Sequence, residues 1–139
     1  LSVSKLLQPE GGSKHARIAA VVDHVTKNFY ESFSVAQAAR LANMPDITFS
    51  RNFQAITGHS FIELLKRTRI GQASAMLYAS DDKIPSIAQE VGYKNLANFN
   101  RHFLKVKGMT PSEYRETARK DLTRKTLPEN LAQNREAPS

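Results

Sequence analysis

Residues 99–103 read Phe-Asn-Arg-His-Phe and residues 49–53 read Phe-Ser-Arg-Asn-Phe, so one pattern of two phenylalanines around an arginine occurs twice. Gly58 and Gly108 follow the two copies at the same spacing. Phenylalanines four positions apart lie on one face of an α-helix, and a glycine commonly ends such a helix. Each copy therefore predicts a short helix that is held in a core by its aromatic pair.

The residues before each copy predict a preceding helix and a tight turn. Ala39 stands before Asn43 at the same spacing at which Ala88 stands before Gly92. A small alanine lets two helices approach closely, and asparagine or glycine accepts the positive φ of a tight turn. Helix, turn and helix in this order indicate a helix-turn-helix unit. The repeat predicts two such units in tandem.

Arg51 and Arg101 are expected to face solvent. Each lies two positions from a phenylalanine of the core, which is about 200° around the helix. An exposed helix with its arginine outward is the arrangement that reads base edges in a DNA major groove. For a single copy, a helical hairpin with an ordinary surface arginine is the better interpretation, because a lone helix-turn-helix is a common packing motif. Two copies on one basic chain favour DNA reading.

The spacing of apolar residues predicts an all-α fold of about seven helices. The expected helices are 16–29, 35–42, 46–56, 61–79, 85–91, 96–106 and 111–119. Ser34, Ser60 and Asn95 are expected N-caps, and Thr110 with Glu113 forms a capping-box pattern. The expected organisation is a linker or remnant of a missing N-terminal domain (1–14), a first helix-turn-helix subdomain (15–59), a linking helix (60–79), a second helix-turn-helix subdomain (80–120) and a disordered tail (121–139).

The long helix expected between the two units sets their separation. It would span roughly 30 Å at 1.5 Å per residue. Successive major grooves on one face of DNA lie about 34 Å apart. One rigid helix of this length predicts that both recognition helices enter adjacent grooves. Because the two units differ in sequence, we expect an asymmetric site.

The charge of the chain favours a polyanionic partner. The formal net charge is +7 and the isoelectric point is near 9.9. Acids are sparse around both copies of the repeat: only Glu63 lies between Asp46 and Asp81, and none lies between Glu90 and Glu113. Such a distribution suits a surface that approaches phosphates. The basic run 66–69 is expected to be a solvated helix face, with DNA contact as the alternative.

The composition argues against an enzyme, a disulfide-bonded protein and a membrane protein. The chain has no cysteine, and its four histidines do not show metal-ligand spacing. No serine stands in a nucleophile elbow, and no apolar run approaches the roughly 20 residues of a membrane span. We therefore expect no metal, no cofactor and no membrane contact.

The second unit resembles the DNA-binding domain of AraC/XylS-type bacterial transcriptional regulators. The resemblance covers residues 18–115 and is strongest in the second unit. The residues that carry it are Ile87-Ala88, Val91-Gly92-Tyr93, Asn98-Phe99, Arg101, Phe103, Lys105, Gly108, Thr110-Pro111, Ser112 and Tyr114-Arg115.

The resemblance implies base contacts from the third and sixth helices. In this sequence the matching positions are Ile47, Thr48, Ser50 and Arg51 in the first unit, and Leu96, Ala97, Asn98, Asn100 and Arg101 in the second. Arginines of this kind bind guanine through two hydrogen bonds, and apolar side chains suit a thymine methyl group. A phosphate contact or a free surface charge is the alternative for each arginine, and a capping or bridging role is the alternative for Asn98.

Contacts to the DNA backbone are expected from a second set of residues: Ser60, Lys94, Asn95, Lys105, Lys107 and Thr110.

Two positions depart from the family pattern. Pro45 stands where the family often has a serine cap, so Asp46 is the alternative cap and the helix start is open. Leu104 replaces a frequent lysine, which removes one possible phosphate contact.

These features predict the DNA-binding half of an effector-controlled cytoplasmic regulator. Its partners would be double-stranded DNA, RNA polymerase and a missing N-terminal sensor or dimerisation domain. The chain begins with leucine and a linker-like segment, which favours a fragment. A stand-alone regulator without a sensor domain is one alternative. A helical adaptor that binds an acidic protein is the other.

Overall fold

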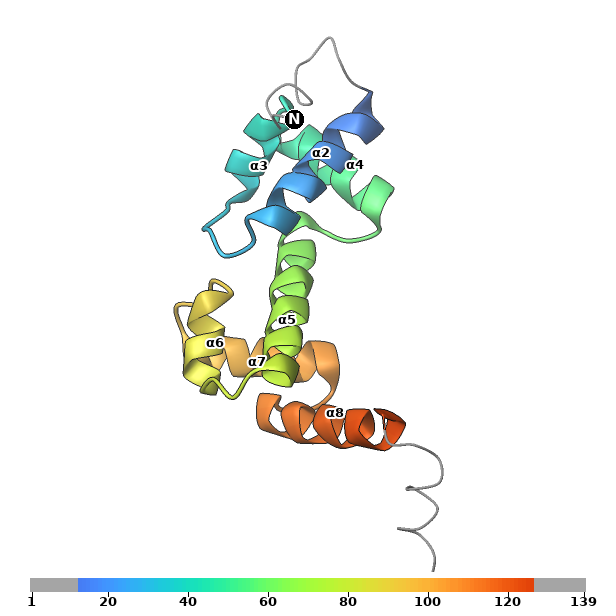
Figure 1. Ribbon diagram of the computed structural model, residues 1–139. Coiled ribbons are helices and arrows are strands. Elements are labelled where there is room, and N and C mark those ends of the chain that lie inside the picture. The colour runs from blue at the N-terminus through green and yellow to red at the C-terminus, as the bar shows by residue number, and fades with distance from the viewer. Residues whose placement is uncertain (1–12, 127–139) are drawn as a thin grey trace, which may run out of the picture.

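The computed structural model describes residues 13–126, with side chains described through residue 121. This part of the chain consists of seven α-helices, without a strand, arranged as two bundles that one helix connects (Figure 1). The helices are α2 (Lys14–Lys27), α3 (Val35–Leu41), α4 (Asp46–Thr57), α5 (Phe61–Ala79), α6 (Ile84–Glu90), α7 (Leu96–Lys107) and α8 (Pro111–Thr126). The predicted all-α fold is confirmed.

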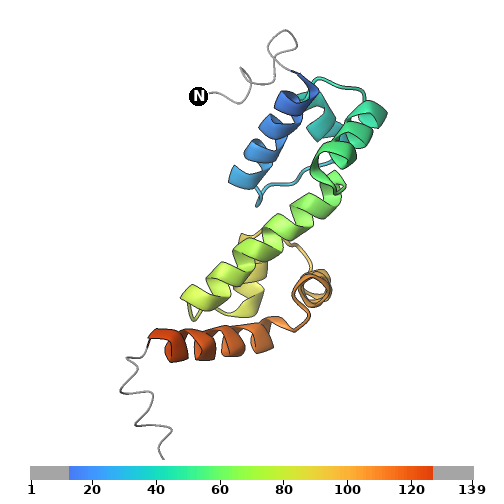
Figure 2. The same ribbon diagram turned by 90° about the vertical axis from the view of Figure 1, so that its right-hand side faces the viewer.

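Each bundle has its own apolar core, and α5 belongs to both. The first core packs α2, α3 and α4 with the start of α5, which contributes Phe61 and Leu65. The second core packs α6 and α7 against the rest of α5, beginning at Ile70. In Figure 2, α5 runs as one continuous helix from the first bundle into the second, and α8 lies across its far end. The shared helix therefore ties the two units together.

The sequence repeat is a structural repeat. The helices α3 and α6 have seven residues each, and α4 and α7 have twelve each. The turn residues Asn43 and Gly92 have φ values of 55° and 103°, which confirms the positive φ expected for both turns. Gly58 and Gly108 end α4 and α7 in the left-handed conformation. Both helix-turn-helix units follow the same backbone plan.

The helix caps follow the sequence prediction except at α4. The side chains of Ser34, Ser60 and Asn95 cap α3, α5 and α7 through backbone N–H groups. At α4 the N-cap is Pro45, which makes no side-chain cap, and the helix begins at Asp46. The predicted start at Asp46 is confirmed, and the alternative in which Asp46 caps the helix is wrong, because Asp46 already lies in the first helical turn. The carbonyl oxygen of Pro45 instead accepts from the Phe49 N–H at 2.8 Å.

The last helix is longer than its sequence pattern predicts. It continues to Thr126, whereas the pattern ends it near Arg119 and predicts a disordered tail from residue 121. Its packing against the end of α5 is polar: the Arg115 guanidinium donates to the Leu77 carbonyl at 2.9 Å and to the Asp82 carbonyl at 2.7 Å. Because arginines stand on the packed face of α8, its apolar residues do not recur at the helical spacing from which a helix is predicted.

Both ends of the chain carry predictions that the structure tests only in part. The predicted linker 1–14 ends two residues too late, since the Ser13 side chain caps α2 and Lys14 begins that helix. The remainder of that linker and residues 127–139 of the tail lie outside the described residues.

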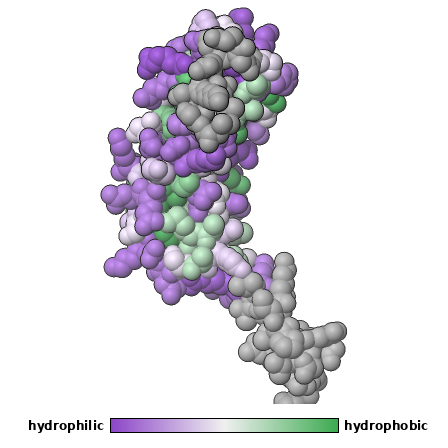
Figure 3. Space-filling model, turned by 45° about the horizontal axis from the view of Figure 1, so that its top comes forward, coloured by the Kyte–Doolittle hydropathy of each residue, from purple (hydrophilic) through white to green (hydrophobic). Residues whose placement is uncertain are grey.

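In the view of Figure 3 the described surface is mostly hydrophilic, with apolar atoms gathered around the middle of the molecule and in smaller spots near its upper right edge. Within residues 13–126, none of the helices combines the length and the apolar character that a membrane crossing requires.

Gly71 offers a test of the shared helix. It lies exposed inside α5, and a Cβ placed on it meets nothing within 4 Å. Glycine inside a helix costs about 0.5–1 kcal/mol relative to alanine, so Gly71→Ala is expected to raise the free energy of unfolding by that amount. Urea denaturation measures it. Gly58→Ala is the control: it is also free of close atoms, but its φ of +83° makes alanine strained, so stability should fall.

Candidate nucleic-acid interface

The helix α4 presents its polar face outward because its aromatic pair is anchored. Phe49 and Phe53 are fully buried, with ring centroids 5.4 Å apart. All four predicted base-reading residues of the first unit are exposed: Ile47, Thr48, Ser50 and Arg51. Ile47 is 67% exposed, which is unusual for an isoleucine and leaves its side chain free to meet another apolar group. The structure thus brings this predicted set together on one free surface.

The helix α7 repeats this arrangement with one difference. Phe99 and Phe103 are fully buried, with ring centroids 5.8 Å apart. Four of the five predicted residues are exposed: Leu96, Ala97, Asn100 and Arg101. The fifth, Asn98, is only partly buried and lies at the edge of the exposed face.

Asn98 connects the cap of α7 with its arginine. The Oδ1 atom of Asn95 accepts from the Asn98 N–H at 3.0 Å, which caps the helix. The Arg101 guanidinium donates to the Oδ1 atom of Asn98. A guanidinium held in this way loses less rotamer freedom when it binds, because part of its orientation is set in advance. The bridging role that was the alternative for Asn98 is therefore present in the free domain.

The residues predicted to contact the DNA backbone lie near helix ends. Ser60 caps α5, and Thr110 and Glu113 form the expected capping box at α8. Each capping hydroxyl still carries its own hydrogen, which it can donate to a phosphate oxygen. Lys94 and Lys105 are exposed, and the ammonium of Lys107 lies 5.6 Å from the centre of the Tyr114 ring.

Tyr93 and His102 form a pair that packs beside the buried Phe99 of α7, and the sequence did not predict this pair. The Tyr93 hydroxyl lies 2.8 Å from Nδ1 of His102, and the Tyr93 ring packs edge-on against Phe99. Burial raises the pKa of Tyr93 to about 12, so its hydroxyl stays protonated. The pKa of His102 is lowered by burial and then by the nearby Lys66 and Arg101. A neutral imidazole that carries its proton on Nε2 accepts a hydrogen bond from the Tyr93 hydroxyl at Nδ1.

The lowered pKa of His102 predicts a loss of stability in mild acid. As pH falls below 6.5, the unfolded chain binds a proton that the folded His102 resists, so stability present above pH 6.5 is lost toward the lowered pKa. Thermal melts between about pH 7 and 5.5 should show a falling Tm; this window avoids carboxylate titration. In His102→Gln the decline should be smaller, and an identical decline in both proteins would contradict the assignment.

Arg69 also differs from its sequence prediction. The run 66–69 was expected to be a solvated helix face, and Arg67 is indeed exposed and paired with Glu63 at 2.9 Å. Arg69 is partly buried instead and donates to two backbone carbonyls of the first unit. The Lys66 side chain is only 15% exposed and pairs with Glu63 at 2.8 Å, so it does not belong to a solvated face either. A run of charged residues in the sequence does not show which of its side chains are buried.

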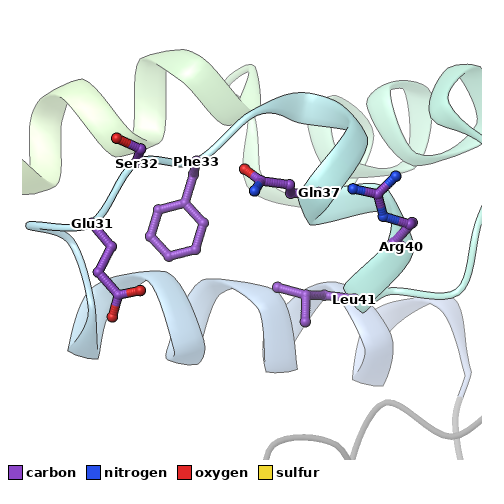
Figure 4. A pocket seen from close by; sticks show the side chains of 6 residues that line it. All are labelled: Glu31, Ser32, Phe33, Gln37, Arg40 and Leu41. Atoms are coloured by element: carbon purple, nitrogen blue, oxygen red, sulfur yellow. The ribbon is translucent and has the colours of Figure 1, made fainter.

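The hollows found on the surface of the described residues are open to solvent. One pocket of about 370 Å³ is lined by residues 31–33 and by α3, with Phe33 and Leu41 as its apolar part and Glu31 and Arg40 as its charged part (Figure 4). This pocket is open to solvent. Among residues 13–126, no three His, Asp or Glu side chains are grouped closely enough to hold a metal ion.

Comparison with known proteins identifies similar folds. A family model described as "Helix-turn-helix domain" matches residues 38–117. The C-terminal domain of AraT, a response regulator from Geobacillus stearothermophilus, superimposes with a TM-score of 0.70 at 28% identity, over 80% of this chain and 87% of that one. The DNA-binding domain of AdpA, described as the global transcriptional factor and crystallised with a target DNA, gives a TM-score of 0.72 at 30% identity, over 76% and 95%.

Two curated bacterial proteins are similar in sequence. The RCS-specific HTH-type transcriptional activator RclR of Escherichia coli strain K12 is 29% identical over 105 residues, which is 76% of this chain. The MmsAB operon regulatory protein of Pseudomonas aeruginosa is 29% identical over 96 residues, or 69% of this chain. This chain spans only 37% and 31% of those two proteins.

Proposed function

Because the chain belongs to the AraC/XylS-type helix-turn-helix family of DNA-binding domains, we propose that it reads one asymmetric operator with α4 and α7 in two successive major grooves. The observation that carries this proposal is the pair of matched recognition helices on one continuous connecting helix. The helix α5 has 19 residues, or about 28 Å of length, and successive grooves on one DNA face are about 34 Å apart.

Arg51 and Arg101 are proposed to read guanines, each with two hydrogen bonds to O6 and N7. Both are exposed and stand at equivalent positions of the two recognition helices. Thr48, Ser50, Asn98 and Asn100 are proposed as further polar contacts to bases. Ile47, Leu96 and Ala97 are proposed to meet thymine methyl groups, which fits their apolar side chains and their exposure.

Phosphate contacts are proposed to set the register on the duplex. Their donors are the side chains of Ser60, Lys94, Asn95, Lys105, Lys107 and Thr110. The net charge of +7 supplies a general attraction in addition. Leu104 is 49% exposed, and its apolar side chain is proposed to make no phosphate contact at that position.

The domain is proposed to act within a longer cytoplasmic regulator that responds to an effector and contacts RNA polymerase. The much greater length of both curated relatives supports a further domain that senses or dimerises. Fusing this domain to an unrelated dimerisation domain tests whether dimerisation strengthens operator binding.

Selection of duplexes from a randomised pool by the isolated domain tests the proposed function. A recovered consensus with two unequal blocks about one helical turn apart is the expected result. The logarithm of the affinity should fall linearly with the logarithm of the salt concentration. A domain that recovers no consensus, and binds an acidic protein with the same salt dependence, would instead be the helical adaptor.

A further inference from the structure

Arg69 stands where α5 passes from one core to the other. Leu65 packs in the first core and Ile70 in the second, so Arg69 lies at the boundary between them. Its Nε donates to the Phe29 carbonyl at 2.7 Å, and its second guanidinium arm donates to the Glu31 carbonyl at 2.6 Å. Both carbonyls belong to the segment between α2 and α3. One side chain thus holds a loop of the first unit.

The same guanidinium touches the second unit at its turn. A Cβ placed on Gly92 would lie 3.0 Å from Nε of Arg69 and 3.1 Å from the Tyr30 carbonyl oxygen. The turn between α6 and α7 therefore packs directly on the guanidinium and on the loop that it holds. A Cβ here would force the guanidinium or the Tyr30 carbonyl to shift, and the φ of +103° also favours glycine.

A short chain of contacts continues from Arg69 to the recognition helix α7. The centre of the guanidinium lies 6.0 Å from the centre of the Tyr93 ring. Tyr93 in turn packs on Phe99 with ring centroids 5.3 Å apart, and its hydroxyl reaches His102. Phe99 and His102 flank the exposed Arg101 in sequence and share its helix. These contacts therefore couple the position of α7 to the loop of the first unit that Arg69 holds.

We propose that Arg69 is a positioning residue that sets the orientation of α4 relative to α7, and that high affinity for a site spanning two grooves depends on it. The proposal rests on the two-groove function proposed above. Arginine suits this role because its planar guanidinium carries several N–H donors in fixed directions and presents a flat face to an aromatic ring. A lysine carries the same charge, but its ammonium has neither donors in fixed directions nor a flat face that can pack on an aromatic ring.

The orientation can be measured without DNA. The chain contains no cysteine, so Gln54→Cys on α4 and Leu104→Cys on α7 place two spin labels at exposed positions of the intact domain. Pulsed electron–electron double resonance should give a narrow distribution of spin–spin distances in this doubly labelled domain. Adding Arg69→Met, which keeps the length of the side chain, should broaden or shift the distribution. Adding Arg67→Met, an exposed neighbour on the same helix, should leave it unchanged.

Binding tests the consequence for recognition. The probes are the duplex that the wild-type domain selects from a randomised pool, and the same duplex with the block read by the first unit scrambled. Arg69→Met should lose about tenfold or more in affinity for the first duplex, because simultaneous engagement multiplies affinity. Its affinity for the scrambled duplex should stay within about threefold of wild type, since single-unit binding does not use the inter-unit orientation.

Arg69→Lys separates positioning from charge. If Arg69 acts by charge alone, lysine restores the affinity in full, and Arg69→Met lowers the salt slope by one phosphate contact. Under the proposal, lysine remains clearly weaker than arginine, and the salt slope is unchanged. Circular dichroism confirms that each variant is folded before it is compared.

The outcomes distinguish the two proposals. An unchanged distance distribution in Arg69→Met, or an equal loss on both duplexes, would overturn the positioning role. A wild-type domain that binds both duplexes equally would overturn the two-groove function, while a broadened distribution would still support Arg69 as the residue that orients the units.

Discussion

Replacing Arg51 and Arg101 together with alanine is expected to abolish most of the preference for the selected operator over random duplex. Each arginine that binds a guanine with two hydrogen bonds contributes about 1–3 kcal/mol of discrimination. The two lie on separate units, so their effects should add to about 2–6 kcal/mol, or at least roughly 30-fold. Fluorescence anisotropy with the selected and the random duplex measures both affinities at one salt concentration.

A charge-matched control separates base reading from general attraction. Lys27 and Lys120 are exposed and form only surface ion pairs with Asp23 and Glu116. Their double alanine variant removes the same two charges without touching α4 or α7. It should weaken binding to both duplexes alike and keep the preference. If the arginine variant behaves in the same way, the arginines contact phosphates or nothing, and the proposed base reading is wrong.

Phe103→Ala is expected to destabilise the domain by about 3–5 kcal/mol, the usual range for truncating a buried phenylalanine. Its ring is fully buried and contacts both Phe99 and Tyr114, with centroids 5.8 Å and 5.5 Å away. Truncation leaves a cavity beneath the recognition helix and frees its link to α8. Chemical denaturation followed by circular dichroism measures the change in the free energy of unfolding.

The neighbouring Leu104→Ala is the control for Phe103→Ala. Leu104 is half exposed, so its truncation should change stability by no more than about 0.5 kcal/mol. Equal destabilisation by both variants would mean that α7 does not pack as the structure shows.

Local signals in the sequence predicted most of the fold. The two Phe–Arg–Phe patterns, the glycine stops and the turn residues Asn43 and Gly92 all act over one or two helical turns, where propensity and capping dominate. The same signals predicted that Arg51 and Arg101 would be exposed. The contacts of these side chains with DNA stay predictions.

The features that escaped prediction depend on tertiary contacts. Arg69 looks like a member of a surface charge run, because its partners Phe29 and Glu31 are distant in sequence and accept through their backbone carbonyls. The packing of α8 against the end of α5 likewise involves Arg115, whose donors bind carbonyls of other segments. Backbone acceptors have no residue-type signature, so no sequence pattern marks them.

The most direct test of the two-groove account is the affinity of the domain for its selected duplex with about five base pairs, half a helical turn, inserted between the two blocks. The insertion turns one groove to the opposite face of the DNA while both blocks stay intact. We expect the affinity to fall about a hundredfold, to the level of a duplex with one block scrambled. An unchanged affinity would contradict simultaneous reading of adjacent grooves by α4 and α7.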